Sequence, residues 1–242
     1  MLLVQKLHRQ VRQSFAGQRL AFAGICALTL TMACNNYGLL DKLQNPGNSS
    51  GSNETFTSNY YVFVSSWTTL GHMGGSPYND VCSSSTGADK ADCACTRAAI
   101  ARGLRKSSTH VFRAWLSLGP STSDAKCRVQ GLGSCTTILP GPWFNTQGQT
   151  VVNNFDSFTL GALTNPIRYD EFGVDQGPNL VWTNTGATGA AAGAVDCNDW
   201  TDNSGGFSGA IGDRTAAGTT WTQHSPDQTC NTSQRIYCVA AP

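Results

Sequence analysis

The stretch ADCACTRAAIARGL, residues 91–104, carries Cys93 and Cys95 with one residue between them. An apolar stripe indicates that the stretch is a helix, and it consists of Ala98, Ala99, Ile100 and Leu104. Residues two apart in a helix differ in direction by about 200°. The two thiols therefore leave opposite faces of the helix, and each needs a partner elsewhere in the chain.

Both ends of this expected helix carry signals. Asp89 or Asp92 can cap its start, and Gly103 suits its end. Three basic residues lie at spacings of three and four around that end, which predicts that they share one face: Arg102, Arg105 and Lys106.

The N-terminus predicts an extracytoplasmic protein. Residues 1–20 carry four basic side chains and no acidic one, and the apolar run LAFAGICALTLTM follows. That run is shorter than the roughly 20 residues that span a bilayer. Ala33 before Cys34 fits a lipoprotein cleavage site, whereas bulky Ile25 before Cys26 does not. We expect a signal peptide at 1–33 and a lipid on Cys34, with a signal anchor or a secreted chain as alternatives.

The mature chain is weakly acidic. Residues 1–33 hold four of the 16 basic residues and none of the 15 acidic ones, so the remaining net charge is −3. Nothing in this charge favours a nucleic-acid partner. Residues 34–58 are polar and predict a flexible tether, and residues 59–242 are enough for one domain. Eight cysteines remain in that domain, an even number that suits disulfides, and spacing alone leaves 105 connectivities.

The domain reads as α+β. Five expected strands are rich in β-branched or aromatic residues: YYVFVSS from Tyr60, VFRAWLSL from Val111, NPIRYD from Asn165, LVWTNT from Leu180 and RIYCVAA from Arg235. Segments rich in Gly, Ser, Thr and Asn are expected loops, among them PGPWFNTQG at 140–148 and DNSGGFSGAIGD at 202–213. The pattern predicts one or two helices and a large loop-rich half.

The order of several segments resembles a known family. These are SSWTTLGHMGG, ADCACTRAAIARGL, FRAWLS, NPIRYDEFG, NLVWTNTGATG, DCNDW and RIYCV. The order is similar to that of endostatin, and more closely to the endostatin-like outer-membrane lipoproteins of leptospires. The likeness extends from about Tyr60 to Val239, with extra residues around 76–90 and 121–137. It implies a C-type-lectin-like fold with two nested disulfides, Cys95–Cys238 and Cys197–Cys230, and it leaves Cys82–Cys93 and Cys127–Cys135 for the insertions.

The sequence offers candidate residues for a zinc site and for a calcium site, and both sets have a simpler interpretation. Zinc is not expected, because His72, His110 and His224 lie in three segments and the N-terminal histidines that hold zinc in endostatin are missing. The run DCNDWTDN offers oxygen atoms of the kind that calcium accepts, on Asp196, Asn198, Asp199, Asp202 and Asn203. It lacks the Glu-Pro-Asn and Trp-Asn-Asp elements of calcium-dependent lectins, so we expect a turn with Asx hydrogen bonds beside a disulfide. Trp182 and Trp200 are expected in the core rather than as sugar platforms.

Signals for catalysis are few. GGFSGA around Ser208 has Ala210 where a nucleophile elbow needs glycine. SDAK, from Ser123 to Lys126, lacks the partner motifs of penicillin-binding enzymes. We expect no catalytic residue, cofactor or metal. An envelope hydrolase is a minor alternative, which would need His224 or His110 near Ser208.

Basic residues gather on the helix and on the strand after it. The candidate patch consists of Arg97, Arg102, Arg105, Lys106 and Arg113. Such clustering predicts a local positive surface, with a solvated helix end as the equal alternative. The resemblance implies that this region binds heparan sulfate.

The resemblance also implies a function. It indicates a lipid-anchored, adhesin-like protein of the cell envelope, exposed on the outer membrane. The implied ligands are extracellular-matrix proteins such as laminin and fibronectin, or complement factor H. A module that binds an anionic polysaccharide is the alternative, since a fold does not fix a ligand.

Overall fold

The computed structural model describes residues 57–83, 87–119, 123–131, 135, 140–178, 180–193 and 196–241. The expected signal peptide, Cys34 and all but the last two residues of the tether lie outside these ranges. Within them, no helix is both long enough and apolar enough to cross a membrane.

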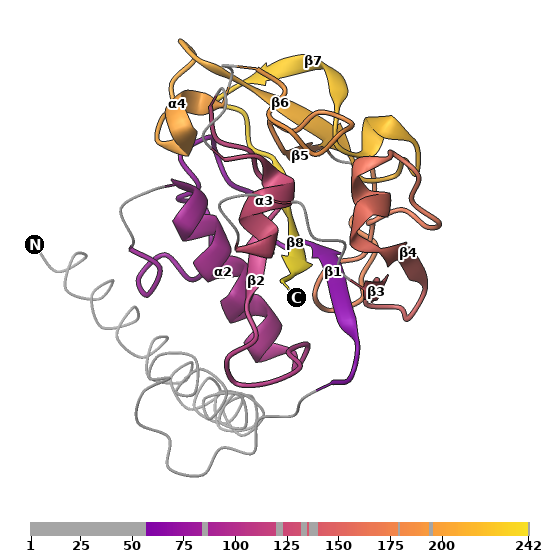
Figure 1. Cartoon of the computed structure of the whole chain (residues 1–242). Helices are drawn as coiled ribbons and strands as arrows, with labels where there is room; N and C mark the ends of the chain where they lie inside the picture. The colour runs from indigo at the N-terminus through magenta and orange to yellow at the C-terminus, as the bar shows by residue number, and fades with distance from the viewer. Residues whose placement is uncertain are drawn as a thin grey trace, which may run out of the picture. The chain divides into compact units, whose positions relative to one another are not determined.

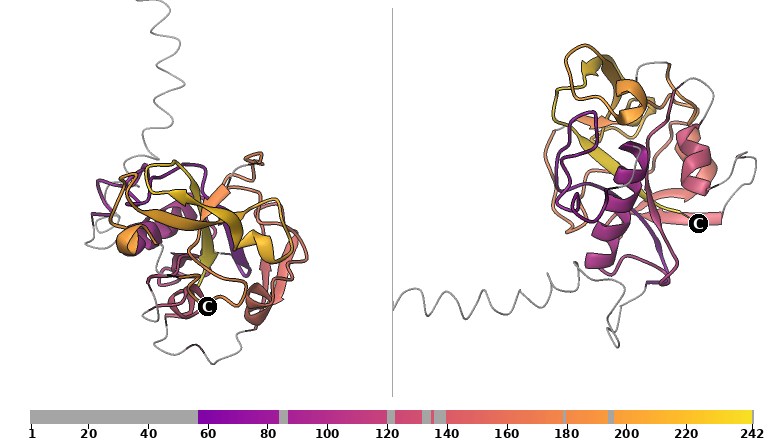
Figure 2. Two further views of the ribbon diagram at one scale, coloured as in Figure 1. Left: turned by 90° about the horizontal axis from the view of Figure 1, so that it is seen from above. Right: turned by 90° about the vertical axis from the view of Figure 1, so that its left-hand side faces the viewer.

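An eight-stranded mixed sheet forms the centre of the domain, in the order β4-β3-β1-β8-β5-β6-β7, with β2 paired to β8. Its strands are β1 (Tyr60–Val64), β2 (Phe112–Ala114), β3 (Pro140–Phe144), β4 (Thr150–Asn154), β5 (Leu180–Trp182), β6 (Ser208–Asp213), β7 (His224–Thr229) and β8 (Arg235–Ala240). Figures 1 and 2 show β6 and β7 at one end of the domain, and Figure 1 shows β3 and β4 towards the other.

The strand β8 organises the sheet. All six of its residues are buried, as expected for a strand that is covered on both faces. It pairs antiparallel with β1 and β2 and parallel with β5. Its apolar and β-branched sequence, RIYCVA, is therefore the reason that distant segments of the chain meet here.

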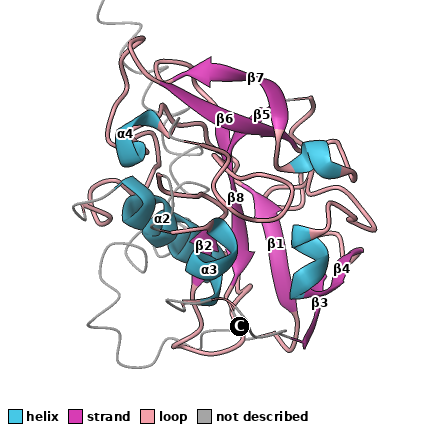
Figure 3. Ribbon diagram, turned by 45° about the horizontal axis from the view of Figure 1, so that its top comes forward, coloured by secondary structure: helices cyan, strands magenta, loops and turns pink. Residues whose placement is uncertain are grey.

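Helices flank this sheet. The longest helix among the described residues is α2 (Gly87–Ala101), which packs on β2 and β8, and α3 (Ala125–Gln130) packs on β2, as Figure 3 allows the reader to follow. The short elements are α4 (Cys197–Trp200) and the 3-10 turns η1 (Phe155–Thr159) and η2 (Thr219–Trp221). The inner face of α2 carries small residues, which let the helix approach the strands closely: Ala91, Ala94, Cys95, Ala98 and Ala99.

Aromatic rings fill the core beside the sheet. Five of them form one cluster with ring centroids 5.2 to 6.2 Å apart: Trp115, Trp143, Phe155, Phe158 and Trp221. Trp182 and Trp200 are also fully buried, in agreement with the sequence prediction.

Four disulfides link the domain, and they are the four pairs that the resemblance implies: Cys82–Cys93, Cys95–Cys238, Cys127–Cys135 and Cys197–Cys230. Cys95 is fully buried against β8, while Cys93 is half-buried on the other side of α2. The expectation that the two thiols leave opposite faces of the helix is confirmed.

Three predicted elements are wrong. NPIRYD is not a strand, because Asp170 folds the chain into a turn and leaves only single bridges, to Val64 and between Tyr169 and Asp175. PGPWFNTQG contains β3, and its prolines are tolerated near the edge of the sheet. DNSGGFSGAIGD contains β6, where a side chain on Gly212 would collide with the carbonyl oxygen of Trp221.

The predicted caps of α2 also need correction. The helix begins at Gly87, so Asp89 and Asp92 lie inside its first turns rather than before it. Its end is as expected. Gly103 has a φ of 65°, and the N–H groups of Gly103 and Leu104 donate to the carbonyls of Ile100 and Ala99. This Schellman arrangement stops the helix at Ala101 and turns the chain away.

Candidate functional site

The structure gives the five basic residues of the candidate patch different surroundings. Because α2 ends at Ala101, Arg102, Arg105 and Lys106 do not share a helix face, and that part of the prediction is wrong. Arg105 is only 7 % exposed, and its guanidinium donates to the carbonyls of Ser107 and Ser108. A polyanion would have little access to it.

The other members have different surroundings. The ammonium of Lys106 lies 3.8 Å from the ring centre of Tyr60. The guanidinium of Arg113 donates to the carbonyl of Arg128 at the end of α3, so it serves as a helix cap. Arg97 is half-buried on α2, and Arg102 is exposed.

Arg102 belongs to a surface that the sequence analysis did not find. Its guanidinium carbon lies 4.6 Å from the ring centre of Phe172, a residue that is 52 % exposed. Val174, two residues further on, is 54 % exposed. We call Arg102, Phe172 and Val174 the Phe172 surface. The signal in the sequence was two apolar residues inside the polar turn DEFGVDQG.

A buried carboxylate shapes the turn that presents this surface. Asp170 is 2 % exposed, and its Oδ1 accepts from the N–H groups of Phe172, at 2.8 Å, and Val174, at 2.9 Å. The hydroxyl of Thr146, in the β3–β4 turn, donates to the carbonyl of Asp170 at 2.7 Å. These bonds fix the two apolar side chains in an exposed position, so their exposure does not follow from a loose loop.

A second polar feature lies at Glu171, directly beside the turn. The side chain is 4 % exposed and accepts from the backbone N–H of Ser66, at 2.9 Å, and from its hydroxyl. Burial raises the pKa of Glu171 above its ordinary value, although the hydrogen bonds from Ser66 act against that rise.

The acidic run forms a left-handed turn. Four consecutive residues have φ between 54° and 59°: Cys197, Asn198, Asp199 and Trp200. Such a turn is unfavourable by about 1–2 kcal/mol per residue. It is held by the Cys197–Cys230 disulfide and by the indole N–H of Trp200, which donates to the carbonyl of Ser117 at 2.9 Å.

The expected Asx hydrogen bonds are present in this run. Oδ1 of Asp196 accepts from the N–H of Asp199 at 3.0 Å, and Oδ1 of Asp202 accepts from the N–H of Ser204 at 2.7 Å. Burial raises the pKa of Asp196, and the nearby carboxylate of Asp199 raises it further. Within the described residues, no group of three or more His, Cys, Asp or Glu side chains is arranged to hold a metal ion.

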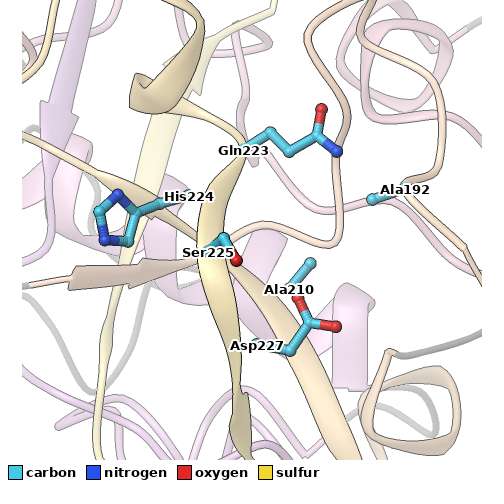
Figure 4. Close-up of a pocket in the computed structure, with 6 residues that line it drawn as sticks. All are labelled: Ala192, Ala210, Gln223, His224, Ser225 and Asp227. Atoms are coloured by element: carbon cyan, nitrogen blue, oxygen red, sulfur yellow. The ribbon is translucent and has the colours of Figure 1, made fainter.

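A cavity of about 390 Å³ lies beside β7. It is lined by Ala192, Ala210, Gln223, His224, Ser225 and Asp227. Figure 4 shows that the ring of His224 points away from the carboxylate of Asp227. These three polar residues of β7 therefore do not form a relay of the Ser-His-Asp kind.

The pairing that the hydrolase alternative requires is not formed either. In the β6–β7 register, His224 lies opposite Ile211, and Ser208 lies opposite Thr229. Ser208 and Ile211 are three residues apart in one strand, or about 10 Å. Ser208 does not line the cavity, and His110 lies before β2 with its ring bonded to the carbonyl of Ala241.

Two comparisons with known proteins, one against family models and one against curated proteins, found no match.

Proposed function

We propose that the protein is a non-catalytic binding module of the cell envelope, anchored through Cys34, whose Phe172 surface contacts a protein ligand. The observation that carries the proposal is the exposed stack of Arg102 on Phe172, with the exposed Val174 two residues further along the same turn. Aromatic residues and arginine are enriched at protein interfaces, and arginine is also enriched among their hot spots.

The position of Arg102 supports a ligand that offers an acidic group beside an apolar one. The guanidinium is exposed and held against a ring, so a carboxylate on the partner meets a charge that is already oriented. The resemblance suggests laminin, fibronectin or complement factor H as the ligands to try first. Exposure on the outer membrane is part of the same proposal.

Binding of variants tests the proposal. We expect Arg102→Glu and Phe172→Ser each to weaken binding to whichever of the three proteins binds wild type by about tenfold, or roughly 1.4 kcal/mol. Arg97→Glu, which makes the same charge change five residues earlier, on α2, and Leu160→Ser, at a residue that is 72 % exposed, are matched controls that should bind as wild type does. Surface plasmon resonance at low and high salt gives the affinities.

The same set separates the alternative ligand. If the ligand is an anionic polysaccharide, heparin retention falls for both Arg97→Glu and Arg102→Glu, falls with salt, and stays unchanged for Phe172→Ser. Wild-type affinity of Arg102→Glu and Phe172→Ser for all three proteins would exclude the Phe172 surface as the binding site.

A further inference from the structure

The cavity beside β7 coincides with an irregularity in the strand pairing. On either side of Ala210, Gly209 pairs with Gln228 and Ile211 pairs with His224. These two pairs are two residues apart on β6 and four apart on β7, so Ala210 alone faces three residues of β7. The longer segment forms a bulge, and bulges re-aim side chains beside binding sites. Ala210 itself is 3 % exposed and lines the cavity.

The bulge directs two polar side chains into the cavity. Ser225 and Asp227 both line it, and Figure 4 shows them on the opposite side of β7 from the ring of His224. Neither side chain has a hydrogen-bond or ion-pair partner within the part of the chain that the structure describes. The carboxylate of Asp227 is therefore a negative charge that no group of the protein compensates directly.

Gln223 adds a group of the opposite polarity to the same cavity. Its Oε1 accepts from the backbone N–H of Ala187 at 3.3 Å, which holds the amide in one orientation. Its Nε2 has no acceptor among the described residues. The cavity thus offers a carboxylate and a hydroxyl as acceptors, and an oriented amide nitrogen as a donor.

The charge of the lining selects the ligand. No described lysine or arginine lines the cavity, so an anion would meet the Asp227 carboxylate without a basic side chain beside it. A metal ion needs more oxygen ligands than one carboxylate and one hydroxyl supply, and the described residues contain no metal-holding group. A neutral sugar would gain nothing from the charge. A primary ammonium group needs only acceptors, and its hydrogen bonds to a carboxylate are assisted by the charge.

We propose that this cavity binds the side chain of a lysine residue of a peptide or protein partner. The ammonium group lies at Asp227 and Ser225, and a backbone carbonyl of the ligand accepts from Nε2 of Gln223. Ala192 and Ala210 give the methylene groups of the lysine a small apolar contact. The volume of about 390 Å³ is in the range of small-ligand sites and exceeds what an ammonium group alone would fill.

The affinity of one such side chain is low. Asp227 is exposed, so its ion pair with the ligand is solvated and contributes little. We expect a dissociation constant of order 10⁻³ M for an isolated lysine residue. The site therefore adds to the affinity of a larger partner and does not extend the Phe172 surface, which consists of other residues.

NMR titration of the disulfide-intact chain with Nα-acetyl-lysine amide tests the proposal. We expect saturable shifts of the backbone amide signals of Ala210, Ser225 and Asp227. Nα-acetyl-norleucine amide, which has an apolar chain without the ammonium group, should cause no saturable shift. Putrescine has the ammonium group but no carbonyl to accept from Gln223, so it should bind more weakly than the lysine derivative.

Three variants locate the site. Asp227→Asn keeps the size of the side chain and removes its charge, and it should weaken binding about fivefold. Asp80→Asn makes the same charge change at an exposed residue between β1 and α2, and it should bind as wild type does. Ala192→Leu fills the cavity from an exposed position without changing a charge, and it should abolish the saturable shifts.

The outcomes separate the proposal from its alternatives. Saturable shifts at β7 that Asp227→Asn weakens and Asp80→Asn leaves unchanged support the site. The absence of saturable shifts in wild type, unchanged affinity of Asp227→Asn, or equal binding of the norleucine derivative overturns it. Tighter binding of putrescine overturns the assignment to a lysine residue. None of these variants alters the Phe172 surface, so the failure of one proposal leaves the other standing.

Discussion

At the scale of single residues, His110 is held in its neutral form. Its Nδ1 accepts from the backbone N–H of Lys106 at 3.1 Å, and its Nε2 is bonded to the carbonyl of Ala241. Burial lowers the pKa of His110 below its ordinary 6.5, and the nearby charges of Lys106 and Arg105 lower it further, while the bond to Ala241 acts in the opposite direction. A proton on Nδ1 would break the bond from Lys106.

This arrangement predicts a pH dependence of stability. Because the folded pKa of His110 lies below the unfolded one, its contribution is fully present above pH 6.5 and is lost as the pH falls through that value towards the folded pKa. We expect the free energy of unfolding, measured with urea at about pH 7.5 and about pH 5, to fall more for wild type than for His110→Gln. Identical pH dependence of the two proteins would contradict the role given to His110.

At the scale of elements, one ion pair joins α2, β2 and α3. Nη2 of Arg128 lies 2.9 Å from Oδ2 of Asp92, and Nη1 donates to the carbonyl of Leu116 at 2.7 Å. Oδ1 of Asp92 accepts from the N–H of Ala114 at 2.8 Å. The Arg128 side chain is 8 % exposed, so its removal leaves a poorly solvated carboxylate behind.

We therefore expect Arg128→Met to lower the free energy of unfolding by about 3 kcal/mol, the lower end of the range for breaking a buried pair. Arg168→Met is the matched control. Arg168 pairs with Asp175 at the surface, with its side chain 41 % exposed, so its loss should lower the free energy of unfolding much less than the loss of Arg128 does. Denaturant titrations of both variants give the comparison, and similar losses would show that burial does not decide the value of these pairs.

At the scale of the whole molecule, the four disulfides are unequal. Cys95–Cys238 closes 143 residues and is fully buried, whereas Cys127–Cys135 closes eight and Cys135 is half-buried. In the chain-entropy model the long loop contributes about 5 kcal/mol and the short one about 2.5. We expect Cys238→Ser to cost about 2.5 kcal/mol more than Cys135→Ser in denaturant titrations. Equal losses would contradict the entropic account for this domain.

The sequence predicted those elements whose signal is local. The helix at 91–101 followed from its apolar stripe, its end from Gly103, and β1, β5 and β8 from β-branched and aromatic runs. It failed for β3 and β6, whose prolines and glycines resemble loop residues, because contacts with distant partners decide those positions. NPIRYD failed for the opposite reason, since the Asp170 carboxylate competes for the backbone locally.

The residues of the candidate sites show the same contrast between local sequence signals and distant contacts. The sequence by itself determined that Cys93 and Cys95 take separate partners and that Trp182 and Trp200 are buried, because helix geometry and side-chain apolarity act at short range. Only the tertiary structure decided that Arg105 is buried, that Arg102 lies on the distant Phe172, and that Asp227 lines a cavity with Ala192 and Ala210. These placements depend on where the chain turns and on which distant segments β8 brings together, and no local periodicity in the sequence records them.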